Sequence, residues 1–247
     1  MSFDPRQLLR SILYPGLDIH VRDRGSLRRY WRSGPRDVLD AGCGNGYLAW
    51  LAYKSGAQVV ALSFDTKSVE KAKKLLVEFR GADPDRLSFE CANLYDLSEE
   101  NRTFDEIICF EVLEHIKGDQ IVAREFYRIL RPGGVLHLCC PYRLHPRHQA
   151  EVLDEAEQGG HVRPGYTEAE YRALLEPLGF KIEQVVGLGT AAVYYVDAVM
   201  RKIRNRFGDL LALPLLPLGL AVVSSAKHDP RVPFSLYVRA VKPSVSA

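Results

Sequence analysis

The segment DAGCGNG at residues 40–46 constrains the fold of this chain more than any other stretch. A short apolar run, Val38 and Leu39, comes before it, and a segment of helical composition at 47–53 follows it. A strand, a glycine turn and a helix N-terminus together form a cradle for a nucleotide, because glycine lets the backbone approach the ligand and the first helical N–H groups point at it. Glycine triplets occur in many turns, so the interpretation depends on the rest of the chain.

Length and composition favour one globular domain. The chain has 247 residues, of which 47% are hydrophobic and 26% charged. This length and hydrophobic content are enough to form a full hydrophobic core. A net charge of +2 does not indicate a nucleic-acid-binding protein. Residues 1–11 lack the apolar run of a signal peptide, and the five cysteines show neither CxxC nor zinc spacing. We therefore expect a cytoplasmic protein whose cysteines are reduced and buried.

Strand-like and helix-like segments alternate along the chain. Beyond the strand at the glycine turn, apolar runs predict strands at 58–63, 87–91, 105–110, 135–140, 180–186 and 234–241. Helical patterns cover 66–80, 119–130 and a segment that begins with a capping box of Thr167 and Glu170 and ends at Gly179. Repeated strand–helix units predict an α/β fold with a mainly parallel sheet and helices on both faces.

Four segments carry motifs in a specific order: VLDAGCGNG at 38–46, FDEIICFEVLEHI at 104–116, LRPGG at 130–134 and YTEAEYRALLEPLGF at 166–180. In this order the chain resembles the class I S-adenosylmethionine-dependent methyltransferases, in particular their small-molecule (type 11-like) branch. The resemblance implies a Rossmann-like, mostly parallel seven-stranded sheet whose last strand is antiparallel. It divides one domain (1–247) into an N-terminal arm (1–36), a cofactor-binding core (37–189), an insert or lid (190–231) and a last strand with its tail (232–247).

A nicotinamide-binding Rossmann enzyme is the main alternative to this interpretation. A dinucleotide fingerprint needs a third glycine where this chain has Tyr47, and an acid after the second strand. Both features are missing, so the methyltransferase interpretation is favoured.

The resemblance implies S-adenosylmethionine as the cofactor, bound by residues at the ends of the first four strands: Asp40, Gly42, Gly44, Gly46, Ser63, Phe64, Asn93, Leu94 and Phe110. Ser63 stands where the family has an acid that binds the ribose hydroxyls. Asp65 is either its substitute or the N-cap of the following helix, and we favour the N-cap. The Asn93 carbonyl oxygen is expected to accept from the adenine amino group, and the Leu94 N–H to face the ring.

Histidines are the best candidates for proton transfer, because imidazole titrates near neutral pH. His115 follows the fourth strand, although a structural role at a helix start carries equal weight for it. His161 lies in the loop after the fifth strand and is expected near the acceptor. We expect His145 and His148, in the same loop, on the solvated surface.

The spacing of Glu111, Glu114 and His115 admits a metal site. On a helical turn these residues share one face, and with His161 they would suit Mg²⁺ or another divalent ion. The pattern is similar to that of metal-using 2′-O-methyltransferases of small RNAs and of some ubiquinone-pathway O-methyltransferases. Similar strings also occur in metal-free relatives, so the metal-free interpretation is favoured.

Three variable segments are expected to select the acceptor: the arginine-rich arm, the loop 141–166 and the insert. The insert contains an apolar run at 210–223, preceded by Arg201, Lys202, Arg204 and Arg206. This run is too short to span a membrane, so we expect a lid or an interfacial contact through 201–223. The predicted function is methyl transfer to an O or C atom of a small apolar or lipid-like molecule, with no nucleic-acid partner. The alternative is a non-catalytic cofactor-binding protein of the same fold.

Overall fold

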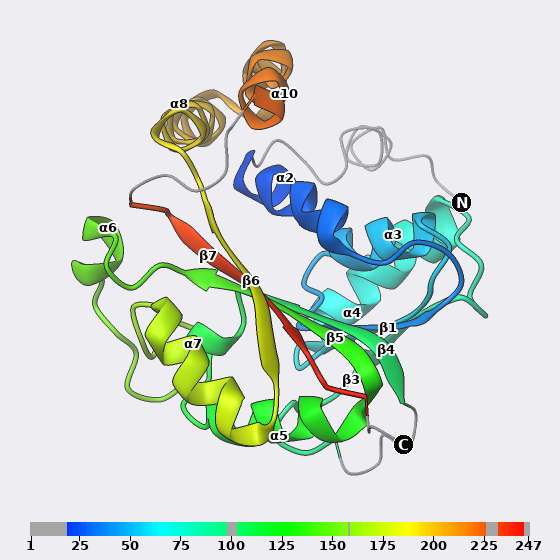
Figure 1. Ribbon diagram of the computed structural model, residues 1–247. Coiled ribbons are helices and arrows are strands. Elements are labelled where there is room, and N and C mark those ends of the chain that lie inside the picture. Colours follow the sequence, from blue (N-terminus) through cyan, green and yellow to red (C-terminus); the bar gives the residue numbers. More distant parts are fainter. Residues whose placement is uncertain (1–18, 98–102, 158, 226–231, 245–247) are drawn as a thin grey trace.

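Seven strands form one sheet in the computed structural model, which describes residues 19–97, 103–157, 159–225 and 232–244. The strands are β1 (Asp37–Ala41), β2 (Gln58–Ser63), β3 (Leu87–Cys91), β4 (Phe104–Phe110), β5 (Leu130–Pro141), β6 (Lys181–Leu188) and β7 (Ser235–Val241). Their order is β3-β2-β1-β4-β5-β7-β6 (Figure 1). Strands β1 to β5 pair in parallel, and β7 is antiparallel to both of its neighbours. The predicted mostly parallel sheet with an antiparallel last strand is confirmed.

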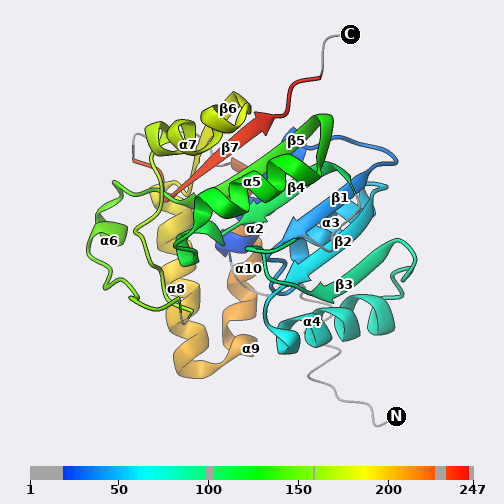
Figure 2. The ribbon, with the colours of Figure 1, turned by 90° about the horizontal axis from the view of Figure 1, so that it is seen from below.

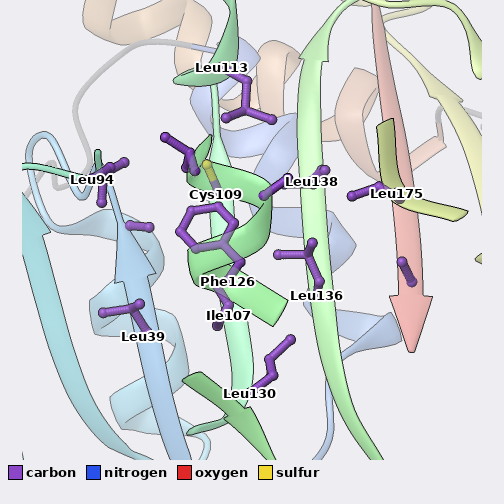
Figure 3. Packing of buried hydrophobic residues seen from close by; sticks show 14 of the residues in the cluster. Leu39, Leu94, Ile107, Cys109, Leu113, Phe126, Leu130, Leu136, Leu138 and Leu175 are labelled. Atoms are coloured by element: carbon purple, nitrogen blue, oxygen red, sulfur yellow. The ribbon is translucent and has the colours of Figure 1, made fainter. Parts of the chain in front are cut away.

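Helices cover both faces of the sheet (Figure 1). One face carries α3 (Tyr47–Lys54) and α4 (Thr66–Lys73), which continues as the π-helix η2 (Lys74–Phe79); the other carries α5 (Asp119–Ile129) and α7 (Glu168–Leu175), followed by η4 (Glu176–Leu178). Successive strand residues point to opposite faces, so Val38 joins the core under α3 while Leu39 joins the core under α5. Figure 3 shows Phe126 of α5 lying over β4 and β5 in this second core.

The remaining described helices are α2 (Ile19–Gly25), η1 (Ser26–Tyr30), η3 (Leu113–His115), α6 (Pro146–Gln149), α8 (Ala191–Phe207), α9 (Asp209–Ala212), η5 (Leu213–Leu215) and α10 (Leu216–Ser225). Figure 2 shows α6, α8 and α10 at the edge of the sheet where β7 begins. Ile19, Val193, Met200 and Ala212 form the small core that joins α2 to α8 and its continuation. We call α8, α9, η5 and α10 the helical cap. Within the described ranges, no helix is long and apolar enough to cross a membrane.

Two elements differ from the predictions. Strand β5 begins at Leu130, five residues before the predicted start, because Leu130 already pairs with Phe104 ahead of a register shift in β4. The insert, predicted only as an apolar run, is helical over most of its described length. The arginines at positions 6 and 10 and the end of the insert at 226–231 lie outside the described residues.

A buried polar network ties the segment before β1 to the middle of the sheet. The Glu106 carboxylate accepts hydrogen bonds from the Arg36 side chain, from the Arg32 N–H at 2.8 Å and from His137 Nε2 at 3.3 Å. The Tyr237 hydroxyl lies 2.8 Å from His137 Nδ1. Burial raises the pKa of Glu106, but the hydrogen bonds from His137, from Arg36 and from the Arg32 N–H outweigh it and lower the pKa to about 2. Burial lowers the pKa of His137, so its neutral ring donates to Glu106 and accepts from Tyr237.

Candidate active site

The glycine turn follows β1 and leads into α3. Gly42, Gly44 and Gly46 have φ values of 87°, 51° and 77°, a region that favours glycine. The N–H groups of Gly42 and Cys43 both donate to the Leu62 carbonyl, at 2.9 and 2.8 Å, and hold the turn against β2. A Cβ atom at Gly44 would meet no described atom within 4 Å, so this side of the turn is open to a ligand.

Asp40 supports this turn from below. Its buried carboxylate accepts a 2.9 Å hydrogen bond from the Ala49 N–H in the first turn of α3. Burial raises the pKa of Asp40 to about 7, and the bond to Ala49 opposes the shift. Asp40 therefore fixes the start of α3 behind the glycine turn.

The end of β2 lacks a free carboxylate for a ribose. Ser63 is buried and its hydroxyl accepts from the Asp65 N–H at 3.3 Å. Asp65 accepts from the N–H groups of Lys67 and Ser68, at 3.2 and 3.0 Å, which confirms it as the N-cap of α4. Phe64 between them is 83% exposed, so its ring is available to a ligand above the sheet.

The other predicted cofactor residues lie at the same sheet edge. Asn93 is exposed after β3, and its side-chain oxygen accepts from the Tyr95 N–H at 3.0 Å, which holds the turn in place. The Leu94 side chain is buried beneath this turn, and Phe110 at the end of β4 is buried edge-on against Tyr237. An open glycine cradle, the exposed Phe64 ring and the Asn93 amide fit a nucleoside ligand such as S-adenosylmethionine.

The structure brings the two predicted histidines together. His115 on η3 and His161 in the loop 159–166 have ring centroids 4.7 Å apart, with the rings at 72°. His115 Nδ1 lies 2.9 Å from the Gly160 carbonyl oxygen, and His161 Nδ1 lies 2.8 Å from a Glu151 carboxylate oxygen. Both partners accept hydrogen bonds, so in the neutral form of each ring the proton lies on Nδ1 and Nε2 keeps its lone pair. This assignment of the tautomers follows from the hydrogen-bond partners.

Contacts to η3 and α5 fix the loop that carries His161. Arg163 forms an ion pair with Asp119 and donates to the carbonyls of Ile116 and Lys117, at 2.8 and 3.0 Å. Gly165 has a φ of 109°, and a Cβ atom there would lie 1.9 Å from the Pro141 carbonyl oxygen. Glycine is therefore required where the loop returns to β5.

Glu114 is buried beside the histidine pair with 0% of its surface exposed. Within the described residues, no hydrogen bond of ordinary geometry reaches its two carboxylate oxygens, and the nearby Cys140 thiol and its own N–H oppose the effect of burial without offsetting it. Burial, followed by repulsion from Glu111, raises the pKa of Glu114 well above its usual range. Glu114, His115 and His161 can each place one ligand atom within 4.8 Å of the others, which is a donor set for a divalent cation.

Glu111 does not join this group. Its φ of 56° turns the chain, and helical geometry is limited to η3, so the predicted helical face of Glu111, Glu114 and His115 is wrong. The Glu111 carboxylate instead pairs with Arg24 of α2 at 2.6 Å. The structure therefore gathers three of the four predicted metal ligands.

Two further findings lie on α6 and the segment after it. His148 is buried against Phe234, with ring centroids 4.5 Å apart, so the prediction of a solvated His148 is wrong. Glu151, which holds His161, was not predicted. It follows a four-residue helix in an irregular segment, where no periodicity marks a partner. Cys91 is exposed, while the other four cysteines are buried and free as expected.

Comparison with known sequences places this arrangement among methyltransferases. The profile of a family described as a methyltransferase domain matches residues 21–185. A protein of Mycolicibacterium smegmatis named a probable S-adenosylmethionine-dependent methyltransferase is 30% identical over 167 residues, which cover 64% of this chain and 56% of that protein. A ubiquinone biosynthesis O-methyltransferase of Nitrosospira multiformis is 26% identical over 174 residues, covering 66% of this chain and 70% of the relative. The chain thus spans little more than half of the first of these relatives.

Solved structures share the fold. The cyclase SpnF superimposes with a TM-score of 0.64 at 19% identity, over 91% of this chain and 81% of that one. The phosphoethanolamine N-methyltransferase 2 of Haemonchus contortus, in complex with S-adenosylmethionine, superimposes with a TM-score of 0.62 at 20% identity, over 91% of this chain and 53% of that one. At these identities the likeness concerns the fold alone.

Proposed function

This chain belongs to the methyltransferase domain family, and on that premise we propose that it transfers a methyl group from S-adenosylmethionine to an O or C atom of a small apolar or lipid-like molecule. The histidine pair carries the proposal. Strand β4, which leads to His115, pairs with β1, which leads into the glycine turn. Two imidazoles with available Nε2 atoms therefore lie one strand away from the cofactor cradle.

The bound cofactor supplies an electrophilic methyl group on a good leaving group. The protein has to orient the acceptor and remove its proton. His161 is the better placed base, because the Glu151 carboxylate stabilises the imidazolium that forms. His115, with its Nδ1 proton held by the Gly160 carbonyl, lies against it and limits the position of the acceptor.

The helical cap supports an apolar acceptor. Its exposed side chains include Phe207, Leu211, Leu218 and Leu220. As a lid, these apolar side chains would exclude water from the acceptor. As an interfacial segment, residues 201–223 would contact a membrane surface. The relative from Nitrosospira multiformis is named as an O-methyltransferase, which favours oxygen as the methylated atom.

The cofactor site is tested with Gly44→Val and isothermal titration of S-adenosylmethionine. A branched side chain would enter the open side of the turn and strain its φ of 51°, so we expect affinity to fall about 100-fold or more. Gly81→Val is the matched control, because Gly81 also has a positive φ of 69° and open space around its Cβ position among the described atoms. Equal affinity of the two variants would contradict the proposed cofactor site.

A second candidate function, metal-dependent O-methyl transfer, is favoured by the convergence of Glu114, His115 and His161. These three residues fit a divalent ion. No hydrogen bond of ordinary geometry reaches the Glu114 carboxylate among the described residues, and both imidazoles have Nδ1 next to an acceptor, as metal-binding histidines do. A bound ion would supply Lewis acidity toward the acceptor oxygen.

Glu114→Gln separates the two functions. If His161 acts as a base without metal, Glu114 is not a ligand, and because burial disfavours its charged form, the isosteric neutral amide should keep turnover within a few-fold of wild type. If a metal is bound, the amide should lower both turnover and metal affinity by about 10–100-fold. EDTA should then abolish wild-type turnover and Mg²⁺ restore it. His161→Ala should lower turnover about 100-fold under either function, and full activity of that variant would contradict both.

A further inference from the structure

A basic groove lies between α6 and α8, at the same sheet edge as the helical cap. Its volume is about 640 Å³, and its polar lining consists of Arg147, Tyr194, Arg201, Lys202, Asn205 and Arg206. Four of these side chains are cationic, and no carboxylate is among the lining residues. We propose that this groove binds a phosphate group of the methyl acceptor, an assignment that rests on the proposed function.

The helical repeat of α8 builds one wall of the groove. Arg201, Lys202, Asn205 and Arg206 are spaced by one, three and four residues, so they turn toward one side of the helix. Arg147 completes the groove from α6. Its guanidinium donates to the Tyr194 hydroxyl at 3.1 Å and lies 5.9 Å from the centre of the Phe234 ring, over its face. Arg147 is therefore held in place before a ligand arrives, which lowers the entropic cost of binding.

The cations of the groove are only partly neutralised by the protein. Arg201 pairs with the buried Asp197 at 3.0 Å. Lys202 and Arg206 are exposed, and no acidic partner is found for them among the described residues. Like charges four residues apart on a helix destabilise it, and a bound anion would relieve this repulsion. Several cations around one hollow match a phosphate, which carries up to two charges and accepts the forked hydrogen bonds of arginine.

Short helix α6 connects the groove with the catalytic histidines. Arg147 faces the groove, while the next residue, His148, is buried and lies 3.4 Å from one Glu151 carboxylate oxygen. The other Glu151 oxygen holds His161 at 2.8 Å. A phosphate in the groove would thus anchor a molecule whose remainder can extend to the histidine pair. Tyr195 and Val199 are exposed on the adjoining face of α8, which suits an acceptor that is apolar next to its phosphate.

The test uses the 247-residue chain with two probes. Inorganic pyrophosphate is titrated in calorimetry, and phosphatidylcholine vesicles with or without phosphatidylglycerol are used in sedimentation. The variant Lys202→Glu with Arg206→Glu should weaken the binding of pyrophosphate about 100-fold, or release the protein from anionic vesicles. The control Lys71→Glu with Lys74→Glu makes the same charge change at exposed lysines of α4 and η2 and should bind like wild type.

Each outcome decides the proposal. Charge-dependent binding of pyrophosphate identifies a soluble phosphate ester as the ligand, and binding to anionic vesicles alone identifies a lipid headgroup. Wild type that binds neither probe, or equal binding by the groove variant, the control and wild type, would overturn it. Titration of S-adenosylmethionine into the same samples distinguishes this proposal from the proposed function. The groove variant should bind the cofactor with unchanged affinity. A protein that binds phosphate but no cofactor would contradict the proposed function alone.

Discussion

Two buried glutamates show how neighbouring donors set the charge of a residue. Glu106 and Glu114 both have 0% of their surface exposed. Glu106 accepts from Arg36, Arg32 and His137, and its pKa is lowered to about 2. Glu114 has no such donors within the described residues, and its pKa is raised. The first is a structural anion, whereas burial disfavours the charged form of the second, which a bound cation would favour.

The charge of Glu106 should make the free energy of unfolding depend on pH. Its pKa in the folded state, about 2, is below the ordinary value of 4.5, so the stabilisation is present at neutral pH and is lost as pH falls from 4.5 toward 2. Glu106→Gln should lower the free energy of unfolding at pH 7 by about 3 kcal/mol, and the difference from wild type should shrink in acid.

Urea denaturation across this pH range measures the effect. Glu183→Gln is the control, because Glu183 pairs with Arg239 at the surface and is 42% exposed at its side chain. Its removal should change the free energy of unfolding by less than about 1 kcal/mol at any pH. A pH-independent difference between wild type and Glu106→Gln would contradict the assigned charge.

At the scale of elements, the loop 159–166 offers the best test of how contacts with the sheet position the His161 side chain. Gly165→Ala would push a methyl group into the Pro141 carbonyl, so the loop must shift away from β5 and carry His161 with it. We expect a loss of about 2 kcal/mol or more of unfolding free energy, and lower turnover with unchanged affinity for S-adenosylmethionine. Thermal denaturation and steady-state assays measure both effects.

Gly81→Ala controls for backbone strain alone, since its Cβ position is open among the described atoms. If Gly165→Ala and Gly81→Ala have the same stability and turnover, close contact with β5 does not position His161.

Elements were predictable from the sequence where one local pattern determined them. Apolar runs predicted the strands, and the capping box of Thr167 and Glu170 predicted the start of α7. The helical cap was not predictable, because prolines at 214 and 217 interrupt its apolar run and the partners of that run lie on α2. Glu111 shows the same limit: its left-handed φ and its bond to Arg24 depend on contacts far along the chain, which spacing alone does not contain.

At the scale of the whole molecule, the order of the strands explains why the site could be located before its partners were known. Strands β1, β2, β3 and β4 end at one edge, so residues that follow them had to meet there. This reasoning located the glycine turn and brought His115 and His161 to one place. The order of the strands does not predict the role of Glu151 or the groove between α6 and α8. Their side chains come from segments that connect the strands, and the topology of the sheet gives the direction of such a segment but not the residues that it contacts.

The place of β7 between β5 and β6 has a consequence for biosynthesis. Strand β7 follows the other six in the chain, yet β6 pairs with it and does not pair with β5. During translation, β5 and β6 therefore emerge from the ribosome with unpaired edges and stay open until residues 235–241 have been made. Open strand edges promote association between nascent chains. A chaperone that shields these two strands would thus be most useful during synthesis of the helical cap, whose residues are translated in that interval.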